Sequence, residues 1–139
     1  MIEIDKMSVA MQNAAQQAAA ACVAEVAGVT AVVIATVDGF DLASVCRKGQ
    51  DPARIAAMAS SISAISAVVS MEAGLGSFRS VTIGTDDGFA LVQAVPRGDV
   101  ELVINLIADG GAILAQAMHR AGLIAKTLAA LPAEPTNLG

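Results

Sequence analysis

The stretch VTAVVIATVDGFDLASVCR, residues 29–47, decides the fold of this chain. It holds a run of β-branched and small apolar residues at 29–37, the turn pair Asp38-Gly39, and a second short apolar run at 42–47. β-branched residues favour strands, and an Asp-Gly pair between two such runs is a strong hairpin signal. The stretch therefore predicts two antiparallel strands.

The first of these strands is apolar on both faces. Val33 and Val37 fall on one face, while Val32 and Ile34 fall on the other. The run 102–107 further along the chain shows the same property. Because a strand that is apolar on both faces needs cover on both faces, we expect a sheet that lies between two layers of helices.

The remaining elements follow outward from this hairpin. Residues 8–27 are rich in Ala and Gln and predict a helix that ends at Gly28. Asp51 and Pro52 are suited to begin a central helix over 52–73, which ends before a glycine. Three strands follow over residues 78–85, 89–95 and 100–108, with Gly-containing turns between them. A final helix follows over residues 109–131.

The predicted element order is α-ββ-α-βββ-α. Hairpin connections make the sheet mainly antiparallel, so the fold class is α/β (α+β), with five strands sandwiched between the central helix and the two terminal helices. Residues 1–131 form this one domain, and residues 132–139 are expected to be a disordered C-terminal tail.

The composition excludes some partners. The chain has 139 residues and a hydrophobic fraction of 55%, which allow one domain with a real core, built without Trp or Tyr. The formal net charge is -5, which repels phosphate backbones, and the scarce aromatic residues remove base-stacking platforms. We expect no nucleic-acid partner.

Cysteine usage and hydropathy bear on the compartment. Cys22 and Cys46 lie inside apolar segments, so we expect buried free thiols and a reducing compartment. No basic region precedes an uninterrupted apolar stretch near the start, which favours a cytoplasmic protein. The uncharged run 55–71 is short for a membrane span and holds five serines, so a membrane helix is the less favoured alternative and we expect no membrane insertion.

The central helix lacks an ordinary polar face. Helical spacing places one apolar stripe toward the sheet, formed by Ile55, Met58, Ile62, Ile65 and Val69. The opposite side carries small and apolar residues, with charge only at Arg54 and Glu72: Ala57, Ser60, Ala64, Ala67, Val68 and Met71. Ala and Ser tolerate solvent, and a larger fold could bury both sides. We favour a helix-to-helix contact with a partner subunit, because small side chains let two backbones approach closely.

The strand that follows the central helix predicts a second contact. Residues 78–84 are a plausible sheet edge without Pro or Lys, and only Arg79 could hinder strand addition by another chain. Pairing with its own copy would give a continuous sheet across a twofold axis. The predicted contact residues are Phe78, Arg79, Ser80, Val81, Thr82 and Ile83.

No catalytic, cofactor or metal motif is present in the sequence. His119, the single histidine, is expected on the solvated side of the last helix. Gly74-Leu75-Gly76 lacks the third glycine of a dinucleotide fingerprint and follows a helix, so it is interpreted as a helix end. Asp86-Asp87-Gly88 falls short of an oxygen cage for a cation and is interpreted as a turn. We expect a protein that is not an enzyme.

Four blocks of sequence, in order, resemble the roadblock/LC7 family. They are Val33-Ile34-Ala35-Thr36-Val37-Asp38-Gly39-Phe40-Asp41-Leu42-Ala43, Ile55-Ala56-Ala57-Met58, Ser80-Val81-Thr82-Ile83-Gly84 before a Gly-Phe turn, and Val100-Glu101-Leu102-Val103-Ile104 before a Gly-containing helix start. The resemblance runs from about residue 8 to residue 131. Its specificity lies in the order and spacing of the blocks, since each block alone is mostly apolar patterning.

The resemblance implies a non-enzymatic homodimer with a shared sheet. Such dimers serve as platforms for small Ras-like GTPases or as adaptors in dynein or endosomal scaffolds. Members similar to MglB pair with an MglA-type GTPase and stimulate its hydrolysis. Their docking surface on the two central helices corresponds here to Arg54, Ala57, Ser61, Ala64, Val68 and Met71. The alternative from a different class is a small-ligand sensor of the PAS or profilin-like kind, which needs polar groups converging in an apolar pocket.

Overall fold

The centre of the molecule is an antiparallel sheet in which β1 pairs with β5. The computed structural model describes residues 8–47 and 49–133, so residues 134–139 of the predicted tail lie outside the described residues. The strand order is β2-β1-β5-β4-β3, and every neighbouring pair is antiparallel. The elements are α1 (Val9–Glu25), β1 (Val29–Thr36), β2 (Asp41–Cys46), α2 (Pro52–Glu72), β3 (Ser80–Thr85), β4 (Gly88–Val95), β5 (Leu102–Asp109) and α3 (Leu114–Ala129).

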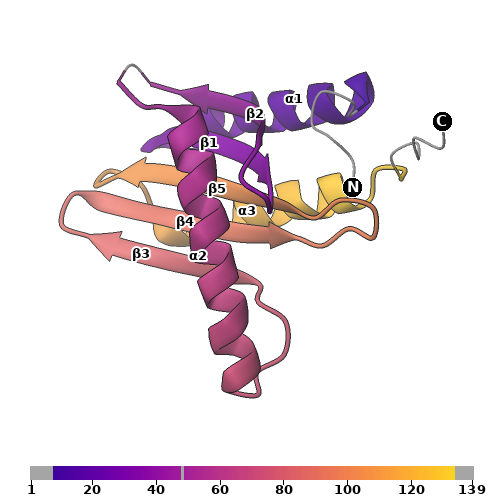
Figure 1. The fold of residues 1–139 in the computed structure, drawn as a ribbon. Helices are drawn as coiled ribbons and strands as arrows, with labels where there is room; N and C mark the ends of the chain where they lie inside the picture. The colour runs from indigo at the N-terminus through magenta and orange to yellow at the C-terminus, as the bar shows by residue number, and fades with distance from the viewer. Residues whose placement is uncertain (1–7, 48, 134–139) are drawn as a thin grey trace.

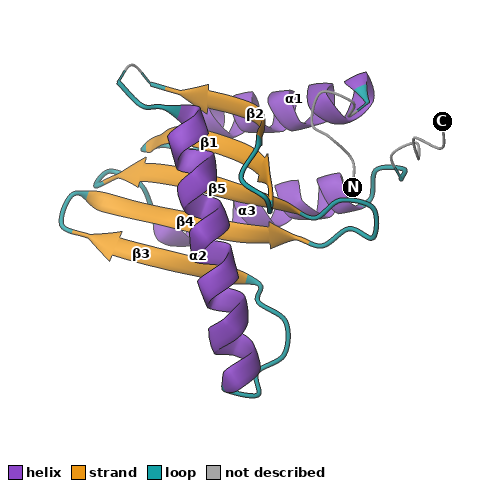
Figure 2. Cartoon of the chain, viewed as in Figure 1, coloured by secondary structure: helices purple, strands orange, loops and turns teal. Residues whose placement is uncertain are grey.

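The helices cover the sheet from both sides, as the sequence predicts. Helix α2 crosses one face of the sheet, while α1 and α3 lie on the opposite face (Figure 1). Figure 2 shows the same three layers, with only turns and short loops between the elements. The order α-ββ-α-βββ-α and the sandwiched five-stranded sheet are confirmed.

The face covered by α1 and α3 carries the larger core. Alternate residues of the central strands, such as Val32 and Ile34 of β1 and Ile104 of β5, are fully buried there against Met11 of α1 and Leu128 of α3. Ser8 begins α1 by accepting a hydrogen bond from the Met11 backbone N–H at 3.0 Å, which satisfies one of the free donors of the first turn. Cys22 is buried in this core as a free thiol, whereas Cys46 is only partly buried.

Helix α3 begins later than predicted, at Leu114. The Asp109 carboxylate accepts a hydrogen bond from the Gly111 N–H at 2.8 Å, which folds this segment into a turn. Glycines are also poor helix formers. Gly28, just before β1, has a φ of 84°, and a side chain there would collide with the backbone of Ala112. The end of α1 and the start of α3 are thereby held close together.

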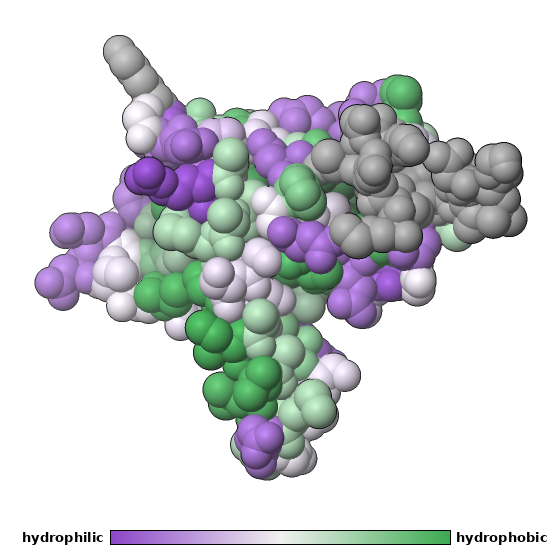
Figure 3. All heavy atoms as spheres, in the orientation of Figure 1, coloured by the Kyte–Doolittle hydropathy of each residue, from purple (hydrophilic) through white to green (hydrophobic). Residues whose placement is uncertain are grey.

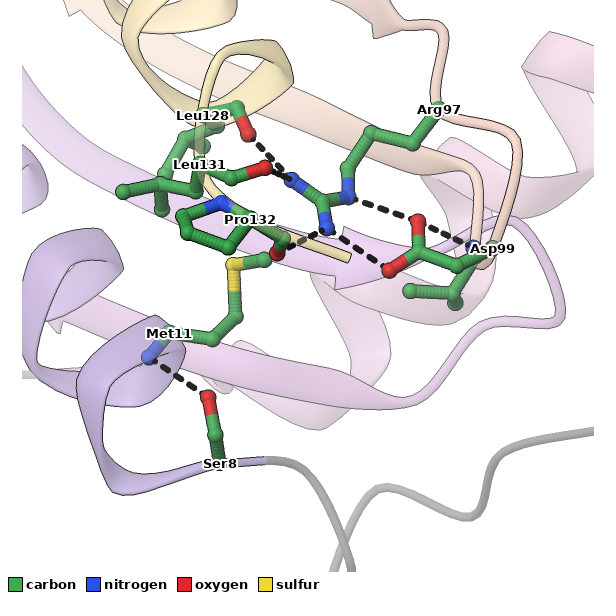
Figure 4. Close-up of polar contacts among 8 residues, drawn as sticks. Ser8, Met11, Arg97, Asp99, Leu128, Leu131 and Pro132 are labelled. Atoms are coloured by element: carbon green, nitrogen blue, oxygen red, sulfur yellow. Dashed lines mark hydrogen bonds and ion pairs between the residues drawn. The ribbon is translucent and has the colours of Figure 1, made fainter. Parts of the chain in front are cut away.

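A buried arginine fastens the β4–β5 turn to the end of α3 (Figure 4). The Arg97 guanidinium makes a bidentate ion pair with Asp99, at 2.9 Å and 2.7 Å. It also donates to three backbone carbonyls at the C-terminus of α3, those of Leu128, Leu131 and Pro132. All five donors of the guanidinium are therefore distributed over two partners, the turn and the helix end. The Arg97 side chain is only 3% exposed, so this contact is part of the core.

Candidate functional site

Helix α2 is well anchored only at its N-terminal half. Asp51 caps the helix by accepting from the Ala53 N–H at 3.0 Å, with Pro52 in the first turn. Its buried residues are Ile55, Ala56 and Ala59, which pack with Val33, Ala35 and Val103 of the sheet. Beyond that point the helix projects past β3, the last strand of the sheet (Figure 1). One half of α2 therefore belongs to the core of the chain, and the other half extends from it.

The predicted sheet-facing stripe of α2 is wrong. Ile55 is buried and Ile62 is partly buried, but three of its five residues are exposed: Met58 by 50%, Ile65 by 65% and Val69 by 59%. The small residues Ala56 and Ala59 face the sheet instead, because the branched side chains of Val33 and Val103 already fill the space between sheet and helix. Since α2 is apolar around most of its circumference, its sequence pattern could not fix which side turns inward.

The outward surface of α2 is consequently more apolar than expected. Large apolar side chains dominate its projecting half, and Figure 3 shows this half as a hydrophobic region of the surface. We call this set the α2 surface: Met58, Ile65, Val68, Val69, Met71 and, just after the helix, Leu75. No charged residue occurs in α2 between Arg54 and Glu72. Contiguous apolar surface of this kind marks interaction sites in soluble proteins.

The residues predicted for the central-helix contact differ in their exposure. Most of them are exposed, namely Arg54, Ala57, Ser61, Ala64, Ala67, Val68 and Met71. Ser60 differs, because its hydroxyl donates a hydrogen bond to the Val37 backbone carbonyl and ties α2 to the end of β1. Ser60 therefore holds the helix on its own sheet and is partly buried.

Strand β3 lies at an edge of the sheet, with most of its residues exposed. The Arg79 carbonyl accepts from the Ala94 N–H of the neighbouring β4 at 2.9 Å. Inward and outward hydrogen bonding alternates along an antiparallel strand, so Ser80, Thr82 and Gly84 direct their backbone groups away from β4. In the described part of the chain, no side chain bonds to these outward groups. Strand β3 thus offers a continuous row of backbone donors and acceptors.

The side chains of β3 join the strand to the α2 side of the sheet. Val81 is paired with Val92, which is fully buried, and Ile83 is paired with Ala90. Ile83 is 41% exposed. Phe78 precedes the strand, is partly buried and lies apart from the β3 edge that Ser80, Thr82 and Gly84 form. The predicted contact residues of 78–83 are therefore divided between the strand edge and the sheet face.

A groove of about 640 Å³ lies between the projecting half of α2 and the sheet. Its lining is mainly apolar and includes Ala67 and Met71 of the helix, Phe78 of the following loop and Val103 of β5. Glu101 is the single charged side chain in this lining. The groove has the size of a small-ligand site, but it lacks the several converging polar groups that orient such ligands.

Two roles of polar residues were missed by the sequence analysis. The Gln16 carboxamide of α1 donates to the Ser44 carbonyl at 3.0 Å and accepts from the Ser44 N–H at 3.2 Å. Ser44 lies in β2, the opposite edge of the sheet. The second missed residue is Arg97, described above. The sequence carries no signal for a contact made by a glutamine within an Ala-rich helix. An arginine two residues before an aspartate in a turn is a weak signal for an ion pair.

The described residues show no group of three or more His, Cys, Asp or Glu side chains that could hold a metal ion. Burial raises the pKa of the Cys22 thiol, and burial with the nearby charges of Asp41 and Asp51 raises that of Cys46. Neither thiol is thereby activated as a nucleophile, because the reactive form is the thiolate. Burial also raises the pKa of Asp41, against a hydrogen bond from Ser44 that lowers it.

Among the described helices, α2 alone has the length and hydropathy of a membrane span. Length and composition are weak evidence for a span, since core helices of soluble proteins share both. The packing of Ile55, Ala56 and Ala59 on the sheet ties the N-terminal half of α2 to this domain.

Comparison with known proteins gives one family. A model of the Roadblock/LC7 domain matches residues 21–104. A comparison with curated protein sequences gives no match.

Several solved structures are similar. A Roadblock/LC7 domain from Streptomyces avermitilis is 18% identical with a TM-score of 0.74, over 81% of this chain and 92% of that one. An MglB with tetrameric arrangement is 16% identical with a TM-score of 0.78, over 88% and 90%. The gliding protein MglB from Thermus thermophilus is 14% identical with a TM-score of 0.76, over 88% and 91%. At these identities the likeness concerns the fold.

Proposed function

This chain belongs to the Roadblock/LC7 family, and from that premise we propose that it is a cytoplasmic, non-enzymatic interaction module. In this proposal it forms a homodimer through α2 and β3, and the dimer binds and regulates a small Ras-like GTPase. The observation that carries the proposal is the projecting half of α2, whose large apolar side chains have no cover within the described chain.

Energetics support an occupant for the α2 surface. Full burial of one large apolar side chain contributes about 1.5–3 kcal/mol. Association itself costs about 4–15 kcal/mol, so several such side chains must be buried together. The α2 surface offers six, each at least half exposed. A second copy of the chain presents an equal surface, which makes an isologous contact the economical arrangement.

The geometry of the two features agrees. Antiparallel pairing of β3 with its own copy, about a twofold axis perpendicular to the sheet, keeps both α2 helices on the same face. Since α2 extends past β3 (Figure 1), each projecting half would then lie over the partner's part of the extended sheet. Exposed apolar residues of that face, such as Ile83, would receive cover.

The dimer is tested by light scattering during gel filtration. We expect twice the mass of one chain at micromolar concentration, and a monomer under these conditions would overturn the proposed assembly. A disulfide offers a geometric check, because Thr82→Cys should form a crosslink between protomers if the two β3 strands pair near this residue.

The GTPase is the finer part of the proposal. Its support is the family, in which the paired central helices are the docking surface, and the outward position of Arg54, Ala57 and Ser61 beside the α2 surface. Immobilised protein should retain a small Ras-like GTPase from native lysate in a manner that depends on a non-hydrolysable GTP analogue or GDP. Gln17→Ala, a change on the opposite side of the sheet, is the matched control. Absence of any nucleotide-dependent Ras-like protein would count against this partner.

The second candidate function is a small-ligand sensor, and the groove beneath α2 is the observation that favours it. Its volume of about 640 Å³ suits a metabolite. Thermal-shift screening against nucleotides and metabolites tests this hypothesis. A large rise in melting temperature with one ligand would favour the sensor over the interaction module.

A further inference from the structure

The two edges of the sheet are treated differently by the chain. The edge at β3 leaves its outward backbone groups free, while the edge at β2 is occupied at its middle by the Gln16 carboxamide. An amide side chain that accepts from one N–H and donates to the C=O of the same residue imitates an incoming strand. Gln16 thus supplies β2 with the pairing that another chain would otherwise provide.

The position of Gln16 explains how it reaches the edge. Its neighbour on the next turn, Ala19, and the adjacent Ala15 are fully buried under α1. Gln16 itself is exposed, at the side of α1 that borders β2. By the alternation of an antiparallel strand, Ser44 and Cys46 direct their backbone groups outward from β1, while Leu42 lies at the register shift. Gln16 takes Ser44, in the middle of the strand.

Other protections of the β2 edge are few. The strand contains no Pro, Lys or Arg, and its single charge is Asp41 at the first position. The register against β1 shifts only at that same end, between Ile34 and Ala35. Natural edges without such residues, bulges or cover are prone to strand addition. The contact with Gln16 is therefore the protection that the middle of β2 has.

We infer that Gln16 guards the β2 edge and confines strand addition by a second copy to β3, so that assembly closes as a dimer. This inference rests on the proposed dimer. A twofold contact at β3 leaves one β2 edge at each end of the shared sheet. If β2 could also pair with its own copy, the two contacts would alternate and generate an open filament. Loss of the Gln16 contact would therefore convert a closed dimer into a growing filament.

The test compares Gln16→Ala with Gln16→Glu and with Gln17→Ala as the matched control. Gln17 is exposed on the same helix, and its side chain has no hydrogen-bond partner among the described residues. We expect the molar mass of Gln16→Ala to rise with concentration to about twofold that of the dimer or more, as dimers join end to end. The control should keep the mass of the original protein.

Gln16→Glu separates guarding from simple attachment of α1. The carboxylate accepts from the Ser44 N–H but cannot donate to its carbonyl, so attachment is weakened. It also places a charge at the edge, which opposes pairing. Guarding predicts that Gln16→Glu remains a dimer while Gln16→Ala grows. Equal behaviour of the two variants, or a Gln16→Ala dimer of unchanged mass, would overturn the inference.

A background with Thr82→Pro distinguishes this inference from the proposed dimer. Proline removes an outward N–H of β3 and weakens pairing there, so assembly of the double variant with Gln16→Ala depends more on β2. Guarding predicts a higher average molar mass for the double variant than for Thr82→Pro alone at the same concentration. Equal masses of the two variants, with native circular dichroism, would overturn the guard. A wild type that is already monomeric would overturn the β3 dimer and leave this comparison intact.

Discussion

The two faces of the sheet are built to different degrees of completion. On one face, α1 and α3 bury a continuous core that includes Val32, Ile34 and Ile104, and Arg97 fastens its end. On the other face, α2 buries only a small cluster around Ile55 and Ala56 before it leaves the sheet. The completed face holds the chain in its fold, and the incomplete face presents the apolar surface that the proposed dimer would cover.

The difference also shows in where the large side chains of α2 lie. On the completed face, the strands contribute large buried side chains, and the inward sides of α1 and α3 combine alanines with Met11, Ile124 and Leu128. On α2, Ile55, Ala56 and Ala59 point inward, while most of the large side chains point out. A helix that turned all its large residues toward its own sheet would leave little apolar surface for a second chain to bury. The observed orientation of α2 therefore suits the proposed dimer.

The largest effect should follow a truncation on the completed face. Ile104→Ala leaves a cavity in a fully buried position and should lower the free energy of unfolding by about 2–5 kcal/mol. Ile65→Ala, on the projecting half of α2, should cost less than about 1 kcal/mol in a monomeric background. Urea denaturation of both variants in the Ala64→Glu background measures the contrast. Equal losses would show that α2 packs on its own sheet as firmly as α1 and α3 do.

The next effect concerns assembly, with the fold preserved. Ala64→Glu places an unpaired charge among the apolar residues of the α2 surface and should weaken the dimer by at least about 2 kcal/mol, about 30-fold in dissociation constant. Sedimentation equilibrium gives the constant, and circular dichroism shows whether the monomer remains folded. Ala53→Glu, exposed in the first turn of α2, is the control and should dimerise normally. If Ala64→Glu dimerises like the control, α2 is not at the interface.

A smaller weakening should follow removal of one edge donor. Thr82→Pro deletes an outward N–H of β3 while the hairpin with β4 keeps its bonds, because proline is tolerated on edge strands. Two hydrogen bonds are lost across a twofold axis, each contributing about 0.5–1.5 kcal/mol. Thr82→Val keeps the N–H and serves as the comparison. Equal dissociation constants for Pro and Val would exclude pairing through this part of β3.

The smallest effect is expected in the alkylation rates of the two cysteines, which differ in burial. Cys22 is buried in the completed face, and Cys46 is partly buried beside the small α2-side cluster. Alkylation should modify Cys46 in the native protein and Cys22 only on unfolding. Because its pKa is raised in the folded state, Cys46 should react more slowly than in the unfolded chain, and its rate should rise as pH increases from about 7 to about 9. Mass spectrometry after timed quenching resolves the two sites, and equally fast modification of Cys22 would contradict the contrast.

The layers and the strand edge could be predicted because they depend on local patterns. A strand that is apolar on both faces, such as residues 29–37, requires two covering layers, and Asp51-Pro52 fixes the start of α2. Residues 78–84, which lack Pro and Lys, were expected at a sheet edge, and β3 is the last strand of the sheet. None of these inferences needed knowledge of a distant contact.

The rotation of α2 and the two polar contacts could not be predicted for the opposite reason. The inward side of α2 is decided by which side chains of β1 and β5 already occupy the space below, as Val33 and Val103 do. Gln16 meets Ser44 across 28 residues of sequence, and Arg97 meets Leu128 across 31. Such contacts are set by the packing of whole elements, which periodicity does not record.

The pairing of β1 with β5 also determines when the sheet can form during synthesis of the chain. These strands form the middle of the sheet, yet Val29 is paired with Ala108, so the first strand made waits for the last one. Until β5 has been made, β1 can pair only with β2, and α1 can pack on only part of the sheet. The nascent chain therefore remains protease-sensitive until β5 emerges, and it becomes resistant in one late step. Limited proteolysis of stalled chains in which β5 is still inside the ribosome or has already emerged would show that step directly.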